Sequence, residues 1–310
     1  MQKLDFQPKF FSCIKNYNKN TFMSDLMAGV IVGIVALPLA IAFAIASGVS
    51  PEKGIVTAII AGFIVSFLGG SKVQIGGPTG AFIVIVYGVI QQYGLAGLTV
   101  ATMIAGVLLI LIGVFKLGTV IKFIPYPVVI GFTSGIAVTI FTTQMADVFG
   151  LNFGGETVPG DFIGKWMLYF RHLDTINWWD AGVCVISVLI IALTPQVSRR
   201  IPGSLVAIIF VTVGVWVMKT YFGITGIDTI GDRFSIDSHL PKAVIPALDW
   251  EAIKNLFPIA VTIAALGAIE SLLSATVADG MISDHHNSNT ELIALGIANM
   301  VTPLFGGIPA

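Results

Sequence analysis

The chain has 310 residues, of which 55% are hydrophobic and only 11% are charged, and its net charge at pH 7 is −1. Soluble domains carry about 25% charged residues, so these few charges could not cover a soluble surface. The composition therefore excludes a soluble globular enzyme, a nucleic-acid-binding protein and a disordered chain. The two cysteines, Cys13 and Cys184, provide neither a disulfide framework nor a metal-binding spacing. We predict an integral membrane protein surrounded by a lipid bilayer, and we expect no metal ion.

Long segments without a charged side chain follow one another along the sequence. A helix needs about 20 apolar residues to cross a bilayer core of about 30 Å. Uncharged runs of that order cover residues 26–51, 54–71, 73–115, 123–146, 181–198 and 201–218, followed by 255–278, with one charge, and by 292–305. The run at 73–115 is long enough for two spans, which we separate near 91–94. Because the runs are continuous, they predict an all-α protein with nine membrane helices rather than a β-barrel of alternating strands.

The positively charged side chains indicate an orientation, because Lys and Arg are enriched on the cytoplasmic side of membrane proteins. With the N-terminus inside, nine of them fall on that side: Lys3, Lys9, Lys15, Lys19, Lys72, Lys116, Lys122, Arg199 and Arg200. Most of the others lie in the long loops 147–180 and 219–254, where the rule is weak. We therefore predict a cytoplasmic N-terminal segment at 1–24 and a transmembrane domain at 25–310.

The first predicted span contains a proline. Pro38 removes a backbone hydrogen bond in the middle of the run, and residues 36–48, which read ALPLAIAFAIASG, include many small side chains. Such a segment is either a kinked helix that packs closely against its neighbours or part of a binding site. The residues of this span leave both interpretations open.

Residues 76–82 read GGPTGAF and begin the third uncharged run. Only about ten apolar residues separate Phe82 from Gln91, which is half a membrane crossing. Proline suits the first turn of a helix, where its missing N–H would be unpaired anyway. This pattern predicts an extended entry and then a half-helix, whose N-terminal N–H groups and dipole favour an anion. An ordinary loop followed by a proline-initiated helix is the alternative.

Glu270 is the only one of the 33 charged side chains that lies well inside a predicted span. A carboxylate at that depth is costly and usually faces a cavity, a proton path or an ion site. No Lys, Arg or His lies mid-span to pair with it, so we predict that Glu270 carries a proton or coordinates Na⁺. Ser274, one helical turn further, would offer an oxygen to the same ligand, or would serve only in helix packing. The loop residues 284–286, Asp-His-His, indicate a polar turn rather than a metal cluster.

The end of the sequence repeats a pattern of its first third. FLGG at 67–70 and GGP at 76–78 are echoed by LFGG at 304–307 and by Pro309. Segments interrupted by glycine and proline at corresponding places in two halves are typical of inverted-repeat membrane proteins with a binding site near the bilayer midplane. The echo is short, and it suggests such a repeat.

Four motifs together resemble the SulP family of sulfate permeases and related anion transporters. They are PLAIAFA at 38–44, GPTGA at 77–81, AIES at 268–271 and GGIPA at 306–310, in the family's order. The resemblance implies an inverted-repeat fold of seven plus seven segments, in which a core domain moves against a gate domain. This chain would be an incomplete transporter domain, with the first repeat and the start of the second, ending before the tenth segment and lacking a STAS domain.

The resemblance also implies a set of substrate-binding residues: Phe43, Thr79, Gly80, Ala81, Glu270 and Ser274. Residues 79–81 would form the tip of the first half-helix, Phe43 would line the site, and Glu270 would hold the coupling ion. Leu39-Ala40 stands where many sulfate-type members have Gln-Gly, which is similar to the bacterial branch that includes cyanobacterial bicarbonate transporters.

The expected function is therefore secondary active transport of a small inorganic anion, sulfate or bicarbonate, by symport with H⁺ or Na⁺. We expect no enzymatic activity, no cofactor other than the coupling ion, and a location in a cell membrane such as the bacterial inner membrane. Two alternatives stay open, a nucleobase permease of the uracil or xanthine type on the same fold, and an anion channel or non-transporting scaffold. A homodimer is one candidate assembly.

Overall fold

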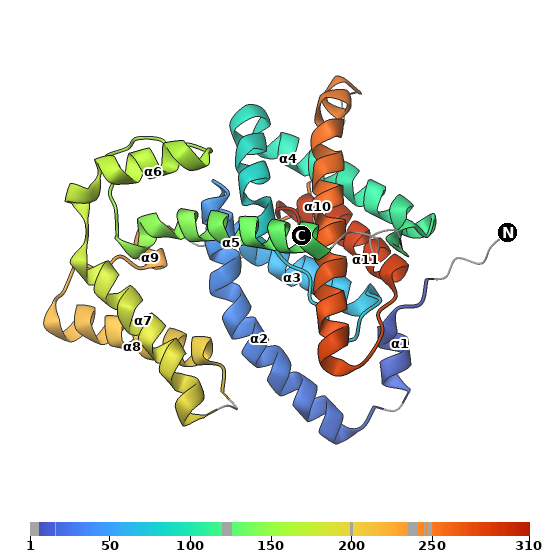
Figure 1. The fold of residues 1–310 in the computed structure, drawn as a ribbon, viewed down its shortest axis with the longest axis horizontal. Coiled ribbons are helices and arrows are strands. Elements are labelled where there is room, and N and C mark those ends of the chain that lie inside the picture. Colours follow the sequence, from blue (N-terminus) through green and yellow to red (C-terminus); the bar gives the residue numbers. More distant parts are fainter. Residues whose placement is uncertain are drawn as a thin grey trace. The chain divides into compact units, whose positions relative to one another are not determined.

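The computed structural model describes residues 6–15, 17–119, 126–198, 201–234, 241–244, 246 and 250–310. Four of the cationic residues that oriented the chain, Lys3, Lys122, Arg199 and Arg200, lie outside this described part. Within it, all regular elements are helices (Figure 1), and the predicted all-α fold class is confirmed.

The helices follow the uncharged runs of the sequence. They are α1 (Lys9–Ile14), α2 (Lys19–Ala46), α3 (Pro51–Leu68), α4 (Ile83–Val114), α5 (Tyr126–Val148), α6 (Phe162–Arg171), α7 (Trp178–Val197), α8 (Gly203–Phe222), α9 (Ile230–Arg233), α10 (Trp250–Ile282) and α11 (Ser288–Val301). The 3₁₀ turns η1 (Gly80–Phe82), η3 (Leu173–Thr175) and η4 (Thr302–Phe305) accompany them. Among the described residues, six helical stretches are long and apolar enough to cross a membrane: α2, α3, η1 with α4, α7, α8 and α10.

The stretch from η1 through α4 consists of two helical halves. Gly94 has φ 66° and ψ −172°, a backbone conformation outside the helical region. Glycine adopts positive φ readily because it has no Cβ. The predicted break near residues 91–94 is therefore confirmed, and a short helix precedes it.

The short helices α1, α6 and α9 lie outside the predicted spans, and α11 starts earlier than predicted. α6 lies in what we expected to be the loop 147–180; it is only 10 residues long and contains charged side chains, so no uncharged run indicated it. α11 begins at Ser288, four residues before the predicted run, because Oδ1 of Asn287 accepts hydrogen bonds from the backbone N–H groups of Asn289 and Thr290, both at 3.1 Å. Such side-chain capping satisfies N–H groups that the helix itself cannot pair.

The chain divides into two compact units. Unit 1 comprises Met1–Asp25, Leu39–Ile136 and Asp237–Ala310, and unit 2 comprises Leu26–Pro38 and Ala137–Ile236. The chain passes from one unit to the other twice inside α2, after Asp25 and after Pro38, and again inside α5.

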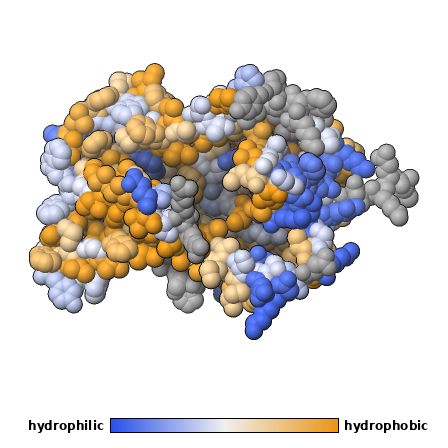
Figure 2. All heavy atoms as spheres, turned by 60° about the horizontal axis from the view of Figure 1, so that its bottom comes forward, coloured by the Kyte–Doolittle hydropathy of each residue, from blue (hydrophilic) through white to orange (hydrophobic). Residues whose placement is uncertain are grey.

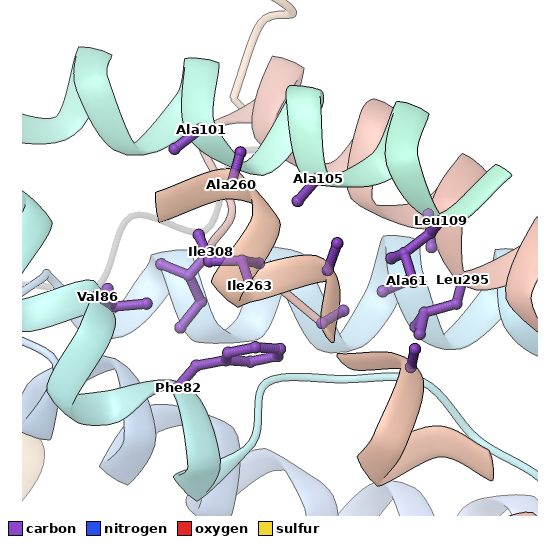
Figure 3. Packing of buried hydrophobic residues seen from close by; sticks show 14 of the residues in the cluster. Ala61, Phe82, Val86, Ala101, Ala105, Leu109, Ala260, Ile263, Leu295 and Ile308 are labelled. Atoms are coloured by element: carbon purple, nitrogen blue, oxygen red, sulfur yellow. The ribbon is translucent and has the colours of Figure 1, made fainter. Parts of the chain in front are cut away.

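Unit 1 is built on the packing of α11 against α3 and α4, and of α10 against α4. Its core is made of small and branched apolar side chains from these helices (Figure 3). Glycines allow α4 and α11 to approach closely: a Cβ on Gly106 would lie 2.7 Å from the oxygen of Gly296, and one on Gly296 would lie 2.6 Å from the oxygen of Gly106. Small residues at a helix crossing are typical of packing within membranes.

Unit 2 contains the paired helices α7 and α8. None of the described residues of α7 is buried, although the helix is strongly apolar. The polar connections hold ion pairs instead: Arg233 lies 3.3 Å from a carboxylate oxygen of Asp228 and 3.4 Å from one of Asp147. Figure 2 shows hydrophobic residues over much of the visible surface, with hydrophilic residues gathered in separate patches. An apolar exterior of this kind fits a lipid environment.

Candidate functional site

The turn that leads into α4 has the form that its sequence predicted. Residues 74–79 form neither helix nor strand, and Thr79 has an extended backbone, with φ −130° and ψ 152°. This segment passes so close to α3 that a Cβ on Gly76 would lie 2.7 Å from Cγ2 of Val65. The 3₁₀ turn η1 then starts at Gly80, so an extended entry leads into a short helix.

Thr79 joins the start of this half-helix to Glu270 on α10. Its hydroxyl accepts a hydrogen bond from the N–H of Ala81 at 3.2 Å and donates one to Oε1 of Glu270. The structure thus brings together two predicted site residues that are 191 positions apart in the sequence. Among the described residues, the other carboxylate oxygen of Glu270 is buried and has no hydrogen-bond partner. That oxygen is available to a proton, a cation or a substrate.

Gln74 makes a second contact between the two segments. Its Nε2 donates to Oγ of Ser274 at 2.6 Å and lies 3.4 Å from the backbone oxygen of Ser271. The Ser274 hydroxyl in turn donates to the oxygen of Ser271 at 3.0 Å. Gln74 was not among the predicted site residues, because the same uncharged run also contains Gln91 and Gln92 and nothing in the sequence distinguishes Gln74 from them.

The other predicted site residues take different positions. Gly80 is buried, and its backbone N–H has no acceptor within the described part of the chain. Ala81 is half-buried, between Gly80 and the fully buried Phe82. Phe43 is also buried, on α2, but no hydrogen bond or ring contact among the described residues joins it to Thr79 or Glu270.

The second glycine- and proline-containing segment, 306–310, reaches the same part of α10. A Cβ on Gly267 would lie 3.5 Å from Cζ of Phe82 and 3.9 Å from the backbone oxygen of Ala310. Figure 3 shows Phe82 and Ile308 near Ile263 of α10. Because Gly267 precedes Glu270 by three positions, it lies about one turn away on the same helix face. The glycine- and proline-containing segment that leads into α4 and the one at 306–310 therefore both lie against α10 near Glu270.

A second carboxylate is buried in unit 1. Glu291 has no exposed surface, and its Oε2 accepts hydrogen bonds from the N–H groups of Gly70 at 2.7 Å and Ser71 at 3.2 Å. Glu270 alone was predicted to be a charge inside a span, because the predicted run at 292–305 began after Glu291 whereas α11 begins at Ser288. The contacts of Glu291 hold the loop after α3 on α11.

The loop between α10 and α11 is held by ion pairs. Lys72 lies 2.8 Å from Asp284 and its hydrogen bond keeps the pKa of that carboxyl, at about 2, well below the usual range. His286 contacts Oδ2 of Asp279 through Nδ1 at 2.7 Å and Oγ of Ser288 through Nε2 at 3.0 Å. These contacts link the end of α10 to the start of α11 through Asp284 and His286.

The sequence as a whole is similar to known membrane transporters. The model of the sulfate permease family matches residues 22–310. The chain is 46% identical over 303 residues to "Putative sulfate transporter YvdB" of Bacillus subtilis, covering 97% of this chain and 56% of that protein. It is 33% identical over 264 residues to "Bicarbonate transporter BicA" of Synechocystis, covering 82% of this chain and 45% of that protein. It spans about half the length of these curated relatives.

Solved structures have the same fold. The transmembrane domain of a cyanobacterial bicarbonate transporter, BicA, superposes with a TM-score of 0.79 at 31% identity, covering 94% of this chain and 75% of that domain. The structure of SLC26A9 superposes with a TM-score of 0.78 and covers 96% of this chain and 50% of its own; at 17% identity, it shows the fold alone.

Proposed function

This chain belongs to the sulfate permease family, and we propose that it transports a small inorganic anion, sulfate or bicarbonate, by a secondary active mechanism. Proteins of this family are transporters rather than enzymes. The observation that carries the proposal is the Thr79 hydroxyl, which links the start of the half-helix to Glu270. An anion-binding element and a membrane-embedded acid are thereby in direct contact.

The anion would bind at the N-terminal end of the half-helix. The N–H of Gly80 is unpaired among the described residues, and the positive end of the helix dipole lies there. Backbone N–H groups bind oxyanions without introducing a full positive charge into the membrane, which suits a substrate that must also be released. Gly80 itself has no side chain to block the approach.

Glu270 would couple this binding to a cation. An ionised carboxylate repels an anion placed beside it, most strongly where water is scarce. A proton on Glu270, or a Na⁺ held by it, removes that repulsion, so the anion and the cation would bind together. The unpartnered oxygen of Glu270 is where we place the proton or the Na⁺. This arrangement makes the transporter a symporter.

Movement would involve unit 1 as one body. Thr79, Glu270, Gln74 and Ser274 all belong to that unit, whose helices pack closely. We propose that unit 1 carries the site while it moves relative to unit 2, and that Pro38, where α2 passes between the units, absorbs part of the motion.

We further propose that the protein lies in the cell membrane with its N-terminus in the cytoplasm. Cys13 is exposed close to that end, whereas Cys184 is half-buried on α7. In a variant of the complete protein in which every cysteine except Cys13 is replaced by serine, a membrane-impermeant maleimide should label Cys13 in inverted vesicles and not in intact cells. Labelling in intact cells would show that the N-terminus lies outside.

Gln74 is expected to affect substrate affinity through its contact with Ser274. Gln74→Leu preserves the size of the side chain but removes the donor, so the entry to the half-helix loses an attachment to α10. A hydrogen bond of this kind contributes about 1 kcal/mol, so the anion concentration at half-maximal uptake should rise roughly threefold to tenfold. Uptake kinetics would measure this, and Gln92→Leu, an exposed glutamine further along α4, is the control. Equal values for both variants would contradict the role of Gln74.

The choice of anion is tested by uptake in proteoliposomes that contain the complete protein. Radiolabelled sulfate and bicarbonate are supplied in parallel, with pH and Na⁺ varied separately. Saturable uptake of one anion that depends on one cation supports the proposal and names both. Labelled uracil is supplied in a third arm, and saturable uracil uptake that neither sulfate nor bicarbonate inhibits would replace the proposal with a nucleobase permease.

A further inference from the structure

Asn299 is a polar side chain buried in the apolar interior of unit 1. It lies on α11 and only 1% of it is exposed. Burying an amide costs free energy unless its donors and acceptor are paired. The partners of Asn299 therefore indicate what this residue does.

The Asn299 amide is paired with the backbone of Ala310, in the segment that follows η4. Its Oδ1 accepts from the N–H of Ala310 at 3.0 Å, and its Nδ2 donates to the oxygen of Ala310 at 2.8 Å. The same Nδ2 also donates to the oxygen of Leu295, at 3.0 Å, within α11. One side chain thus fixes both backbone groups of a single residue and ties them to a rigid helix.

A second anchor lies two residues earlier. The N–H of Ile308 donates to Oγ1 of Thr57 on α3, at 2.8 Å, and Thr57 is fully buried. Between η4 and these anchors lie Gly306, which has φ +74°, and Gly307. Glycines give a chain much conformational freedom, so the position of this segment depends on groups from other elements.

The anchored segment lies against the proposed anion site. A Cβ on Gly267 would lie within 4 Å of the oxygen of Ala310, of Phe82 of the half-helix and of Leu295, and Glu270 follows one turn along α10. A shift of this backbone would move the groups of residues 307–310 that face the half-helix. Positioning of groups around a ligand within a fraction of an ångström governs how well it binds.

We propose that Asn299 is a positioning residue of the anion site: its amide fixes the backbone of Ala310, and with Thr57 it holds the segment 307–310 opposite the turn at 79–82. This inference rests on the proposed function. The substrate class is the same small inorganic anion, which Asn299 does not touch. Its effect on affinity passes through the backbone that it holds.

The test compares variants of the complete transporter in proteoliposomes. Asn299→Leu keeps the approximate volume but removes both bonds to Ala310, and Thr57→Val removes the acceptor for Ile308. Thr57→Ser retains the hydroxyl. Thr102→Val is the matched control, because the Thr102 hydroxyl is equally buried but donates only to Leu98 of its own helix, at 2.8 Å. The readouts are half-maximal anion concentration and maximal uptake per folded molecule, together with hydrogen exchange of residues 306–310.

We expect Asn299→Leu to raise the half-maximal concentration by about tenfold, since it leaves buried backbone groups unpaired, and to speed exchange in 306–310. Thr57→Val should act in the same direction, Thr57→Ser should restore the affinity, and Thr102→Val should keep it. If Asn299→Leu lowers only the melting temperature, with the wild-type half-maximal concentration, Asn299 is a packing residue and the inference fails. Where Asn299→Leu does not fold, the half-maximal anion concentration of Thr57→Val and its hydrogen exchange in 306–310 decide instead. A wild-type protein without saturable anion uptake would instead overturn the proposed function, and this inference with it.

Discussion

Replacing Glu270 by glutamine is expected to abolish cation-coupled anion uptake while leaving the protein inserted and folded. Glutamine keeps an oxygen that accepts the Thr79 hydroxyl, but it can neither gain nor lose a proton and holds a cation far less well than a carboxylate. The dependence of uptake on pH or Na⁺ should disappear, and uptake under a cation gradient should fall by at least about tenfold, the factor that a coupling free energy of about 1.4 kcal/mol represents.

A matched control for this variant lies on the same helix. Glu251, in the first turn of α10, is exposed. Glu251→Gln removes a charge from α10 without touching the site, so its uptake should equal that of the wild type. Undiminished coupled uptake in Glu270→Gln, with insertion verified by protease protection, would rule out the coupling role.

Replacing Gly80 by leucine is expected to prevent anion binding. Gly80 is buried at the first position of η1, where the proposed anion approaches the backbone, and a leucine side chain would occupy that space. The affinity measured by anion-dependent thermal stabilisation should fall by at least about tenfold, because the ligand loses its close approach to the N–H groups.

Gly88 provides the comparison for Gly80. It lies in the same half-helix, but a Cβ there would meet no atom within 4 Å. Gly88→Leu should therefore bind the anion with wild-type affinity, although it carries the same added side chain. If both variants bind equally well, the anion does not sit at the start of the half-helix.

Local patterns in the sequence were sufficient to predict most of the helices. Charge-free runs mark the spans because a charge inside the membrane is costly, and the break at Gly94 followed from the length of one run. α6 was not predicted, because a short helix with charged side chains leaves no uncharged run. The start of α11 was not predicted either, because it depends on the Asn287 cap, which a hydropathy pattern does not reveal.

The candidate site was predictable in its parts but not in its contacts. Glu270 is noticeable as a lone charge and Thr79 as a neighbour of Gly-Pro, yet only the fold shows that one hydroxyl joins them. Gln74 and Asn299 act through partners that the sequence does not associate with them: Ser274 is 200 positions from Gln74. Glutamine and asparagine are common in loops and helices, so their presence in the sequence alone does not indicate a role in a site. The roles of Phe43 and of the coupling ion stay predictions.

The central claim is that a cation gradient drives this protein to accumulate an inorganic anion. The direct test is to load proteoliposomes with labelled sulfate or bicarbonate at the same concentration inside and outside, and then to impose an inward gradient of H⁺ or Na⁺. We expect the internal anion concentration to rise above the external one, and Glu270→Gln to remove this rise. If the anion only equilibrates across the membrane, whatever cation gradient is applied, then transport is passive and no cation is coupled to it.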